Sequence, residues 1–233
     1  MSGDVHCWCV KLDVPPARCA SLYATLADDE RERSERLRSE RDRRRFVVAR
    51  GALRDVLARY VDTEPDQIRF AYNAFGKPEL SPEIGTPGRL RFNLSHSADL
   101  ALIAVAADAD VGVDLERVGD VAGGGGTGGT NYTEIARCFF SAAEFDQLKR
   151  APSHLQQEAF LDGWTMREAY VKARGEGLGD DPVEFADRWS FFSLRPAPGY
   201  IGAVAVEGTG WTTSLLRYDV HSLHLDGRHR RDY

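Results

Sequence analysis

Hydrophobic and polar residues alternate over several short stretches of the chain, which predicts strands. Leu90, Phe92 and Leu94 alternate with polar neighbours, the pattern of a half-buried strand, and residues 100–106 form a short apolar stretch that predicts a buried strand. Pro15 and Pro16 stop the weak alternation that begins at Val5. Further strands are predicted at residues 111–118, 189–194, 200–206 and 211–218.

Two longer stretches have the spacing of helices. Residues 28–60 are highly charged, and their apolar side chains recur near helical spacing, which predicts one long helix. Ser141 is followed three residues later by Glu144, the signature of a capping box at a helix start. Another helix is predicted over residues 156–174, because Gly175 and Gly177 follow it.

The order of these elements repeats. Helix, strand, turn and strand occur once up to Ala106 and again from residue 156 to Val206, and the segments LALIAVAA and YIGAVAVE look alike. Short apolar strands resemble one another, so this similarity alone is weak support. It suggests an α+β fold of two similar halves, residues 1–108 and 109–233, that meet near Ala109.

Composition restricts the classes of partner. The chain has 233 residues and a formal net charge of -6, which argues against general attraction to nucleic acid or to an anionic membrane. Its longest apolar stretch, residues 100–107, is far shorter than the roughly 20 residues that span a bilayer. Two similar halves in one chain favour a monomer.

Cysteine usage and the first residues suggest a cytoplasmic protein. The sequence starts without the charged segment and apolar run of a signal peptide. Cys7 and Cys9 have no second pair or histidine cluster to complete a zinc site. Reduced thiols are the simplest interpretation of the four cysteines.

Asp114 and Glu116 are the sharpest chemical feature. Residues two apart on a strand face the same side, so these carboxylates are expected to project together. Adjacent carboxylates repel each other unless a cation lies between them, and their oxygens suit Mg²⁺. The alternative, a strand end that runs into solvent, is equally consistent with this segment.

Three other features carry charge or a proton-transfer group. Glu168 and Lys172 lie four residues apart on one helix face, as an ordinary surface ion pair or as a carboxylate and an ammonium that act on a phosphate. His96 follows a strand, where it can bind a phosphate or simply complete a turn. The arginines between Arg31 and Arg50 are interleaved with acids, which favours a solvated helix face, although an anion site built from a few of them stays open.

Taken together and in order, these segments resemble a known family. The sequence is similar to the 4′-phosphopantetheinyl transferases of the larger, surfactin-synthetase-activating type, from about Glu30 to about Val206. The resemblance rests on Phe75-Gly76-Lys77-Pro78, Phe92-Asn93-Leu94-Ser95-His96-Ser97, Val111-Gly112-Val113-Asp114-Leu115-Glu116, Phe139-Phe140-Ser141 and residues 164–172, WTMREAYVK.

The resemblance implies a fold, an activity and a set of roles. The fold would be two similar α+β halves related by a pseudo-twofold axis, with the active site between them. The enzyme would transfer 4′-phosphopantetheine from coenzyme A to a serine of an acyl or peptidyl carrier protein, with Mg²⁺, and release 3′,5′-ADP. Asp114, Glu116 and Glu168 resemble the Mg²⁺ ligands, and Glu168 also resembles the general base. Lys172 resembles the lysine that neutralises the transferred phosphate or protonates the leaving group. Coenzyme-binding roles are implied for Lys77, Ser95, His96 and Lys172, and for Arg50, Arg33 and Arg36 at the 3′-phosphate.

Two features depart from the family pattern. Arg167 stands where lysine is usual; its forked guanidinium keeps the charge but differs in shape from an ammonium, and the sequence does not determine the effect on phosphate contacts. The glycine-rich segment 119–130 is longer than is usual in the family and lacks the lysine of a phosphate-binding loop. It lies between the strand with Asp114 and Glu116 and the next helix, so it is expected to border the entrance for the carrier protein.

Two other functions remain to be separated from the transferase. A Mg²⁺-dependent nucleotide phosphohydrolase would use the same carboxylates with water as the acceptor. A non-catalytic binding module would use the arginines alone. The sequence does not identify the carrier protein or its pathway.

Overall fold

A computed structural model of the chain describes residues 3–84, 90–120, 132–175 and 185–218. The elements, in chain order, are β1 (Asp4–Lys11), α1 (Pro16–Ala24), α2 (Asp28–Glu35), α3 (Glu40–Val61), the short 3₁₀ helix η1 (Pro65–Gln67), β2 (Phe70–Tyr72), β3 (Pro78–Leu80), η2 (Pro82–Ile84), β4 (Leu90–Ser97), β5 (Leu100–Ala107), β6 (Val111–Arg117), α4 (Tyr132–Phe139), α5 (Ala142–Arg150), α6 (Gln156–Arg174), β7 (Trp189–Leu194), β8 (Tyr200–Glu207) and β9 (Thr212–Arg217). The fold is α+β, as predicted. Within the described ranges, no helix is long and apolar enough to cross a membrane.

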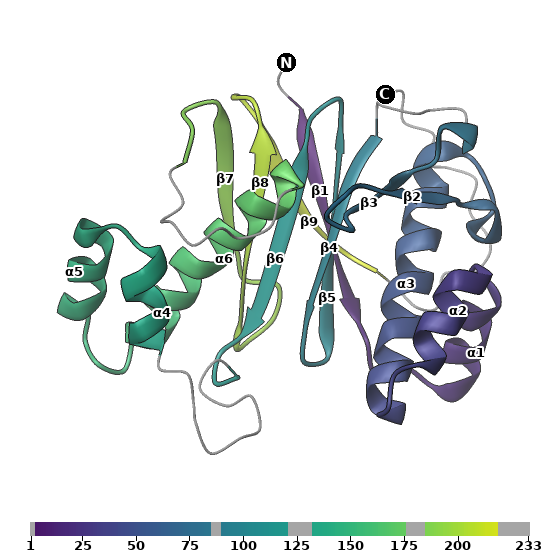
Figure 1. The fold of residues 1–233 in the computed structure, drawn as a ribbon, viewed down its shortest axis with the longest axis horizontal. Coiled ribbons are helices and arrows are strands. Elements are labelled where there is room, and N and C mark those ends of the chain that lie inside the picture. The colour runs from purple at the N-terminus through teal and green to yellow at the C-terminus, as the bar shows by residue number, and fades with distance from the viewer. Residues whose placement is uncertain (1–2, 85–89, 121–131, 176–184, 219–233) are drawn as a thin grey trace.

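The strands form two main sheets and a hairpin (Figure 1). One sheet has the strand order β4-β5-β1-β9, the other has the order β6-β8-β7, and β2 pairs with β3. All pairs are antiparallel except β1 with β9, which is parallel. The sheets meet where β4 and β6 lie side by side, and this seam positions the candidate site.

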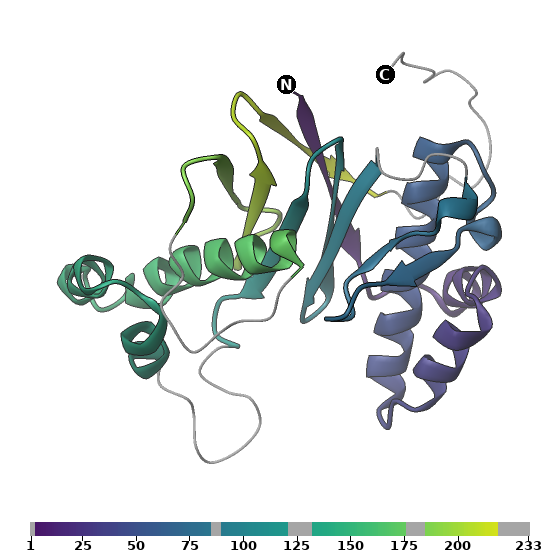
Figure 2. The ribbon, with the colours of Figure 1, turned by 45° about the horizontal axis from the view of Figure 1, so that its top comes forward.

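The molecule has four layers, with a sheet pair in the middle and helices outside (Figures 1 and 2). α1, α2 and α3 lie on one side of the first sheet, and α6 lies against the second. On β5, Ile103 and Val105 belong to the core beneath α3, whereas Leu102 and Ala104 belong to the core shared with β6 and β8. Residues 100–106 are continuously apolar because both faces of this strand are buried.

The strand order recurs in the two parts of the chain. β5 lies between β4 and β1, and β8 lies between β7 and β6. In each set of three, the strand that comes last along the chain is therefore the central one. β8 is also buried on both faces, with Val204 in the core between the sheets and Ala203 in the core beneath α6. The pseudo-twofold relation and the division at residues 108/109 stay predictions. β9 pairs with β1 and so extends the first sheet.

Several element predictions were wrong in detail. The single helix predicted over residues 28–60 is two helices, because Ser39 has an extended backbone and its side chain accepts a hydrogen bond from Asp42 N at the start of α3. Pro16 stops the first strand but also starts α1, since proline suits the first turn of a helix. The β2–β3 hairpin was not predicted, and α4 precedes the helix predicted at Ser141.

Candidate active site

The seam between β4 and β6 is held by side chains of β4. Asn93 Oδ1 accepts a hydrogen bond from Val113 N at 2.9 Å, and Ser97 Oγ accepts one from Arg117 N at 3.1 Å. Ser95 Oγ donates to Asp114 Oδ1 at 2.9 Å, and Ser97 Oγ donates to Glu116 Oε2 at 3.1 Å. Small polar residues on β4 therefore accept hydrogen bonds from backbone N–H groups of β6. They also donate to both carboxylates, which lie on the same side of that strand.

Helix α6 brings Glu168 and Lys172 to this seam. The Lys172 ammonium lies 2.5 Å from Asp114 Oδ1, 3.3 Å from Ser95 Oγ and 3.9 Å from Glu168 Oε2. The helix can approach β6 closely because Gly112 has no side chain: a Cβ there would lie 2.0 Å from the carbonyl oxygen of Ala169. The structure thus brings together Ser95, Asp114, Glu116, Glu168 and Lys172, which the sequence had separated by up to 77 residues.

The electrostatics of this cluster are dominated by carboxylates. Burial and, to a smaller extent, the neighbouring Asp114 together raise the pKa of Glu116 to about 7, against the hydrogen bond from Ser97. Burial also raises the pKa of Glu168, which Lys172 opposes and Asp114 reinforces. One ammonium faces three carboxylates, so the cluster favours an additional cation.

The predicted Mg²⁺ ligands share this region without forming a complete metal site. Among the described residues, no group of three His, Cys, Asp or Glu side chains is arranged to hold a metal ion. Asp114 Oδ2 is nevertheless buried and, within that part of the chain, has no hydrogen-bond partner. An unpaired carboxylate oxygen among other carboxylates fits a hard cation, so a role for Asp114, Glu116 and Glu168 in holding Mg²⁺ stays a prediction.

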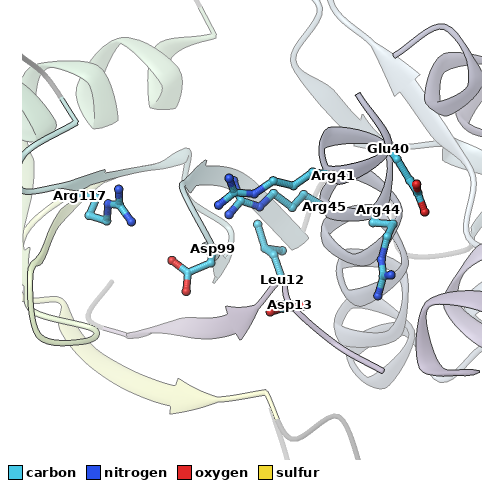
Figure 3. Close-up of a pocket in the computed structure, with 8 residues that line it drawn as sticks. All are labelled: Leu12, Asp13, Glu40, Arg41, Arg44, Arg45, Asp99 and Arg117. Atoms are coloured by element: carbon cyan, nitrogen blue, oxygen red, sulfur yellow. The ribbon is translucent and has the colours of Figure 1, made fainter. Parts of the chain in front are cut away.

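A basic pocket lies near the β4–β5 turn, between α3 and the end of β6. It has a volume of about 490 Å³ and is lined by Leu12, Asp13, Glu40, Arg41, Arg44, Arg45, Asp99 and Arg117. Arg41 and Arg45 extend in parallel from α3 toward Asp99 and Arg117, whereas Arg44 lies on another side of the helix (Figure 3). The parallel guanidinium groups suit an anionic group such as a phosphate.

His96 connects this pocket with the carboxylate cluster. It alternates with the buried Ser95 and Ser97 and is itself exposed, so it projects from the opposite side of the strand. Partial desolvation lowers the pKa of His96, and the positive charges of Lys172 and Arg45 lower it further. The imidazole is therefore within electrostatic reach of Lys172 in the cluster and of Arg45 in the pocket.

The three arginines that were predicted to bind the 3′-phosphate do not line this pocket. Arg33 lies over the ring of Phe46, and Arg36 forms an exposed ion pair with Glu32. Arg50 is buried and donates to Glu30 Oε1 at 3.0 Å and to the Tyr72 hydroxyl at 2.7 Å. Their role at the 3′-phosphate stays a prediction.

Sequence reasoning missed Arg41, Arg44, Arg45 and Arg117 as pocket residues. The signal available was the spacing of Arg41 and Arg45, four residues apart and therefore on one face of a helix. It was obscured because the arginine run appeared to be one helix, and α2 and α3 place its members on different surfaces.

Lys77, which the resemblance assigns to coenzyme binding, and Arg167 both contact groups of the protein itself, and the coenzyme-binding role of Lys77 stays a prediction. The Lys77 ammonium donates to the carbonyl oxygens of Ala173 and Val111. Arg167 is buried, donates to the carbonyl oxygens of Phe139 and Gly163, and pairs with Glu144 at 2.5 Å. The guanidinium of Arg167 therefore joins the start of α5 to α6.

The glycine-rich segment predicted at residues 119–130 falls almost entirely on residues 121–131, which lie outside the described residues.

Sequence comparisons identify the family of the chain. The family described as "4'-phosphopantetheinyl transferase, N-terminal" matches residues 16–108, and the "4'-phosphopantetheinyl transferase superfamily" matches residues 110–222. The 4'-phosphopantetheinyl transferase HetI of Nostoc sp. is 36% identical over 231 residues, which cover 94% of each chain. The chain belongs to the 4′-phosphopantetheinyl transferase family. This confirms the resemblance seen in its motifs and makes the chain an enzyme.

Other relatives of this transferase match a smaller share of its length. The 4'-phosphopantetheinyl transferase psf-1 of Bacillus pumilus is 32% identical over 169 residues, covering 72% of this chain and 66% of the relative. The 4'-phosphopantetheinyl transferase Sfp of Bacillus subtilis is 27% identical over 153 residues, covering 66% and 62%. The transferase and these relatives therefore share a family.

Proposed function

We propose that this transferase moves 4′-phosphopantetheine from coenzyme A to a serine of an acyl or peptidyl carrier protein, depends on Mg²⁺ and releases 3′,5′-ADP. The observation that carries the proposal is the buried, unpaired Oδ2 of Asp114 in a carboxylate cluster that adjoins a pocket of arginines. The carboxylate cluster would bind the pyrophosphate of coenzyme A through a cation, and the arginine pocket would bind its 3′-phosphate. We also propose that the enzyme acts as a cytoplasmic monomer.

Each charged residue of the cluster has a separate role in the proposed reaction. The serine hydroxyl attacks the β-phosphorus of coenzyme A, a new phosphorus–oxygen bond forms, and the bond to the bridging oxygen of the pyrophosphate breaks. Glu168 accepts the proton of the serine, and its raised pKa makes it a better base than an ordinary glutamate. Lys172 neutralises the transferred phosphate or protonates the departing 3′,5′-ADP. Asp114, Glu116 and Glu168 would hold Mg²⁺, which supplies positive charge to the pyrophosphate oxygens.

The proposed reaction is tested by mass spectrometry of carrier proteins. An apo carrier protein incubated with the enzyme, Mg²⁺ and coenzyme A is expected to gain the mass of one phosphopantetheine, and excess chelator is expected to prevent the gain. A parallel incubation without carrier protein tests the phosphohydrolase alternative. Breakdown of coenzyme A in that sample, with unmodified carrier in the other, would overturn the proposal.

Metal binding can be measured without turnover. In the presence of Mg²⁺, coenzyme A at about 100 times its Kd should raise the free energy of unfolding by about 2.7 kcal/mol. The reason is that a ligand that binds only the folded state stabilises that state. Thermal unfolding is expected to show this stabilisation in the wild type and to lose the Mg²⁺-dependent part in Asp114→Asn. Asp146→Asn, an exposed change on α5, is the control. A full Mg²⁺ response in Asp114→Asn would remove Asp114 from the metal site.

The arginine pocket makes a separate prediction about the 3′-phosphate. Arg45→Ala removes a charge-assisted contact of roughly 1.5–3 kcal/mol and should weaken coenzyme A binding by about 10- to 150-fold. Binding of dephospho-coenzyme A should hardly change. Isothermal titration with both ligands measures the difference.

The same titration compares the two sets of arginines. Arg36→Ala alters an exposed ion pair with Glu32, and we expect it to leave both affinities unchanged. Arg50→Ala is measured alongside, with its folding checked by circular dichroism, because Arg50 is buried. Loss of coenzyme A selectivity in Arg36→Ala or Arg50→Ala, with Arg45→Ala unaffected, would place the 3′-phosphate at the residues first predicted from the sequence.

A further inference from the structure

The loop of the β2–β3 hairpin is bonded to the end of α6, the helix that carries Glu168 and Lys172. Asn73 Nδ2 donates to the carbonyl oxygen of Gly175 at 3.1 Å. Lys77 Nζ donates to the carbonyl oxygen of Ala173 at 2.7 Å and to that of Val111 at 3.3 Å. These bonds join a loop of the first part of the chain to a helix about 100 residues later.

The loop itself is braced for this contact. Asn73 Oδ1 accepts hydrogen bonds from Phe75 N and Lys77 N, both at 2.9 Å, and Asn73 N donates to the carbonyl oxygen of Lys77 at 3.0 Å. Gly76 has a φ of +80°, a left-handed conformation that glycine adopts without strain. One side chain thus closes the turn with its oxygen and uses its nitrogen for the helix.

The end of α6 needs such partners. The last carbonyl groups of a helix have no acceptor role inside it, and the helix dipole places partial negative charge there, so an ammonium is favourable. Gly175 ends the helix with a φ of +68°, and a Cβ on it would lie 2.7 Å from Asn73 Nδ2. The close approach of the asparagine therefore depends on a glycine at this position.

The bonds of Lys77 span the two elements that form the carboxylate cluster. Val111 is the first residue of β6, which carries Asp114 and Glu116, and Ala173 directly follows Lys172 on α6. Gly112 lies against the same turn of the helix, because a Cβ there would be 2.4 Å from Ala173 N. Movement of this turn away from β6 would carry Lys172 away from Asp114.

We propose that Lys77 and Asn73 are positioning residues, which hold the last turn of α6 against β6 and thereby set Lys172 opposite Asp114. The ammonium of Lys77 is directed at the protein's own carbonyl groups, in contrast to the coenzyme-binding role expected from the sequence. The inference rests on the proposed transferase reaction for its effect on turnover, while the contact itself is independent of that reaction.

The test uses two variants and a matched control in the full-length enzyme. Lys77→Met removes both ammonium bonds. Asn73→Asp keeps the oxygen that closes the turn but loses the donor to Gly175 O. Lys149→Met makes the same chemical change as Lys77→Met at an exposed position in the last turn of α5.

Three measurements separate positioning from coenzyme binding. Hydrogen exchange of the amides in residues 169–175 should accelerate by about tenfold or more in both variants, because the bonds that hold this turn are lost. At saturating substrates, kcat should fall by roughly 10- to 100-fold, as expected when a catalytic group is misplaced. The Kd of coenzyme A should stay close to that of the wild type. Lys149→Met should match the wild type in all three.

The contrary results are equally distinct. A Kd for coenzyme A that rises strongly in Lys77→Met, with normal exchange and normal kcat at saturation, would make Lys77 a coenzyme ligand and overturn the inference. Unchanged exchange in both variants would also overturn it. If the wild-type enzyme modifies no carrier protein, the proposed function fails, whereas exchange and coenzyme A binding still decide the positioning role. If Lys77→Met does not fold, Asn73→Asp alone supplies the same comparison.

Discussion

Glu168→Gln should lower kcat for carrier-protein modification by about 10²- to 10⁴-fold, the usual contribution of a positioned acid or base. Glu168 lies near Lys172, and burial together with Asp114 raises its pKa, so its carboxylate is well suited to accept the proton of an incoming serine. Glutamine keeps the size and hydrogen-bonding capacity of the side chain but accepts no proton. Steady-state kinetics with a cognate carrier protein measure the effect.

The control for this change lies on the same helix. Glu158 is exposed in the first turn of α6, and Glu158→Gln should retain wild-type kcat. The thermal stability of Glu168→Gln should stay near or above that of the wild type, because the change removes one carboxylate from a cluster with excess negative charge. Near-normal kcat in a folded Glu168→Gln enzyme would exclude Glu168 as the base.

Glu30→Gln should destabilise the folded protein by about 3–5 kcal/mol, because it leaves two buried guanidinium groups without their counter-charge. Glu30 is 2% exposed and accepts from Arg50 Nε at 3.0 Å and from Arg54 Nε at 2.6 Å. Arg54 is 1% exposed and also donates to the carbonyl oxygen of Ile68. Both guanidinium groups lie near the ring of Phe70.

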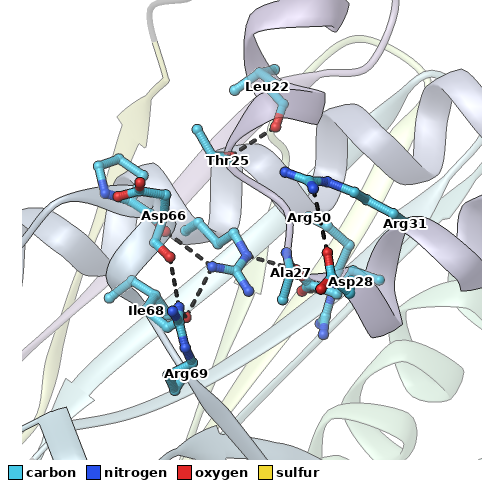
Figure 4. Close-up of polar contacts among 12 residues, drawn as sticks. Leu22, Thr25, Ala27, Asp28, Arg31, Arg50, Asp66, Ile68 and Arg69 are labelled. Atoms are coloured by element: carbon cyan, nitrogen blue, oxygen red, sulfur yellow. Dashed lines mark hydrogen bonds and ion pairs between the residues drawn. The ribbon is translucent and has the colours of Figure 1, made fainter.

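This cluster ties α2 and α3 to the start of the β2–β3 hairpin. Figure 4 shows polar contacts of this region, with Arg50 beside Ala27 at the beginning of α2 and Ile68 near Arg69. Ala27 N also donates to Glu30 Oε2 at 3.0 Å, so the same carboxylate caps α2. The free energy of unfolding in urea measures the loss.

Glu32→Gln provides a matched comparison on the same helix. Glu32 pairs with Arg36 at 3.0 Å, but both side chains are mostly exposed, and such pairs contribute about 0–1 kcal/mol. We expect Glu32→Gln to unfold almost as the wild type does. Equal stability of the two variants would show that the buried carboxylate is dispensable, contrary to the charge arrangement described here.

Local sequence signals predicted the elements that carry the site. The helix expected over residues 156–174 is α6, ended by Gly175 in a left-handed conformation, and the capping box expected at Ser141 starts α5. Asp114 and Glu116 were expected to share one side of a strand, and both contact serines of β4. These predictions succeeded because caps, helix ends and strand alternation depend on residues only a few positions apart.

Predictions that depended on distant partners were less successful. The family pattern implied a coenzyme-binding role for Lys77, which stays a prediction, and left the effect of Arg167 open. Only the structure shows that both side chains donate to carbonyl groups of the protein. The run of arginines showed that positive charge is concentrated in residues 31–50, but it did not show which surface each side chain faces. Only the break between α2 and α3 separates the exposed Arg36, the buried Arg50 and the pocket residue Arg45.

The sequence by itself determined the α+β class, the main strands and helices of the site and the family of this enzyme, because these depend on residue order and local periodicity. Tertiary structure decided which charges face one another. Asp114 meets Lys172 only because Gly112 lets α6 lie against β6, and β9 joins the first sheet only through its pairing with β1. Coulomb energies depend on the distance between charges, and desolvation depends on burial. Residues of the same type therefore bind a ligand, hold two elements together or neutralise a charge according to the fold around them.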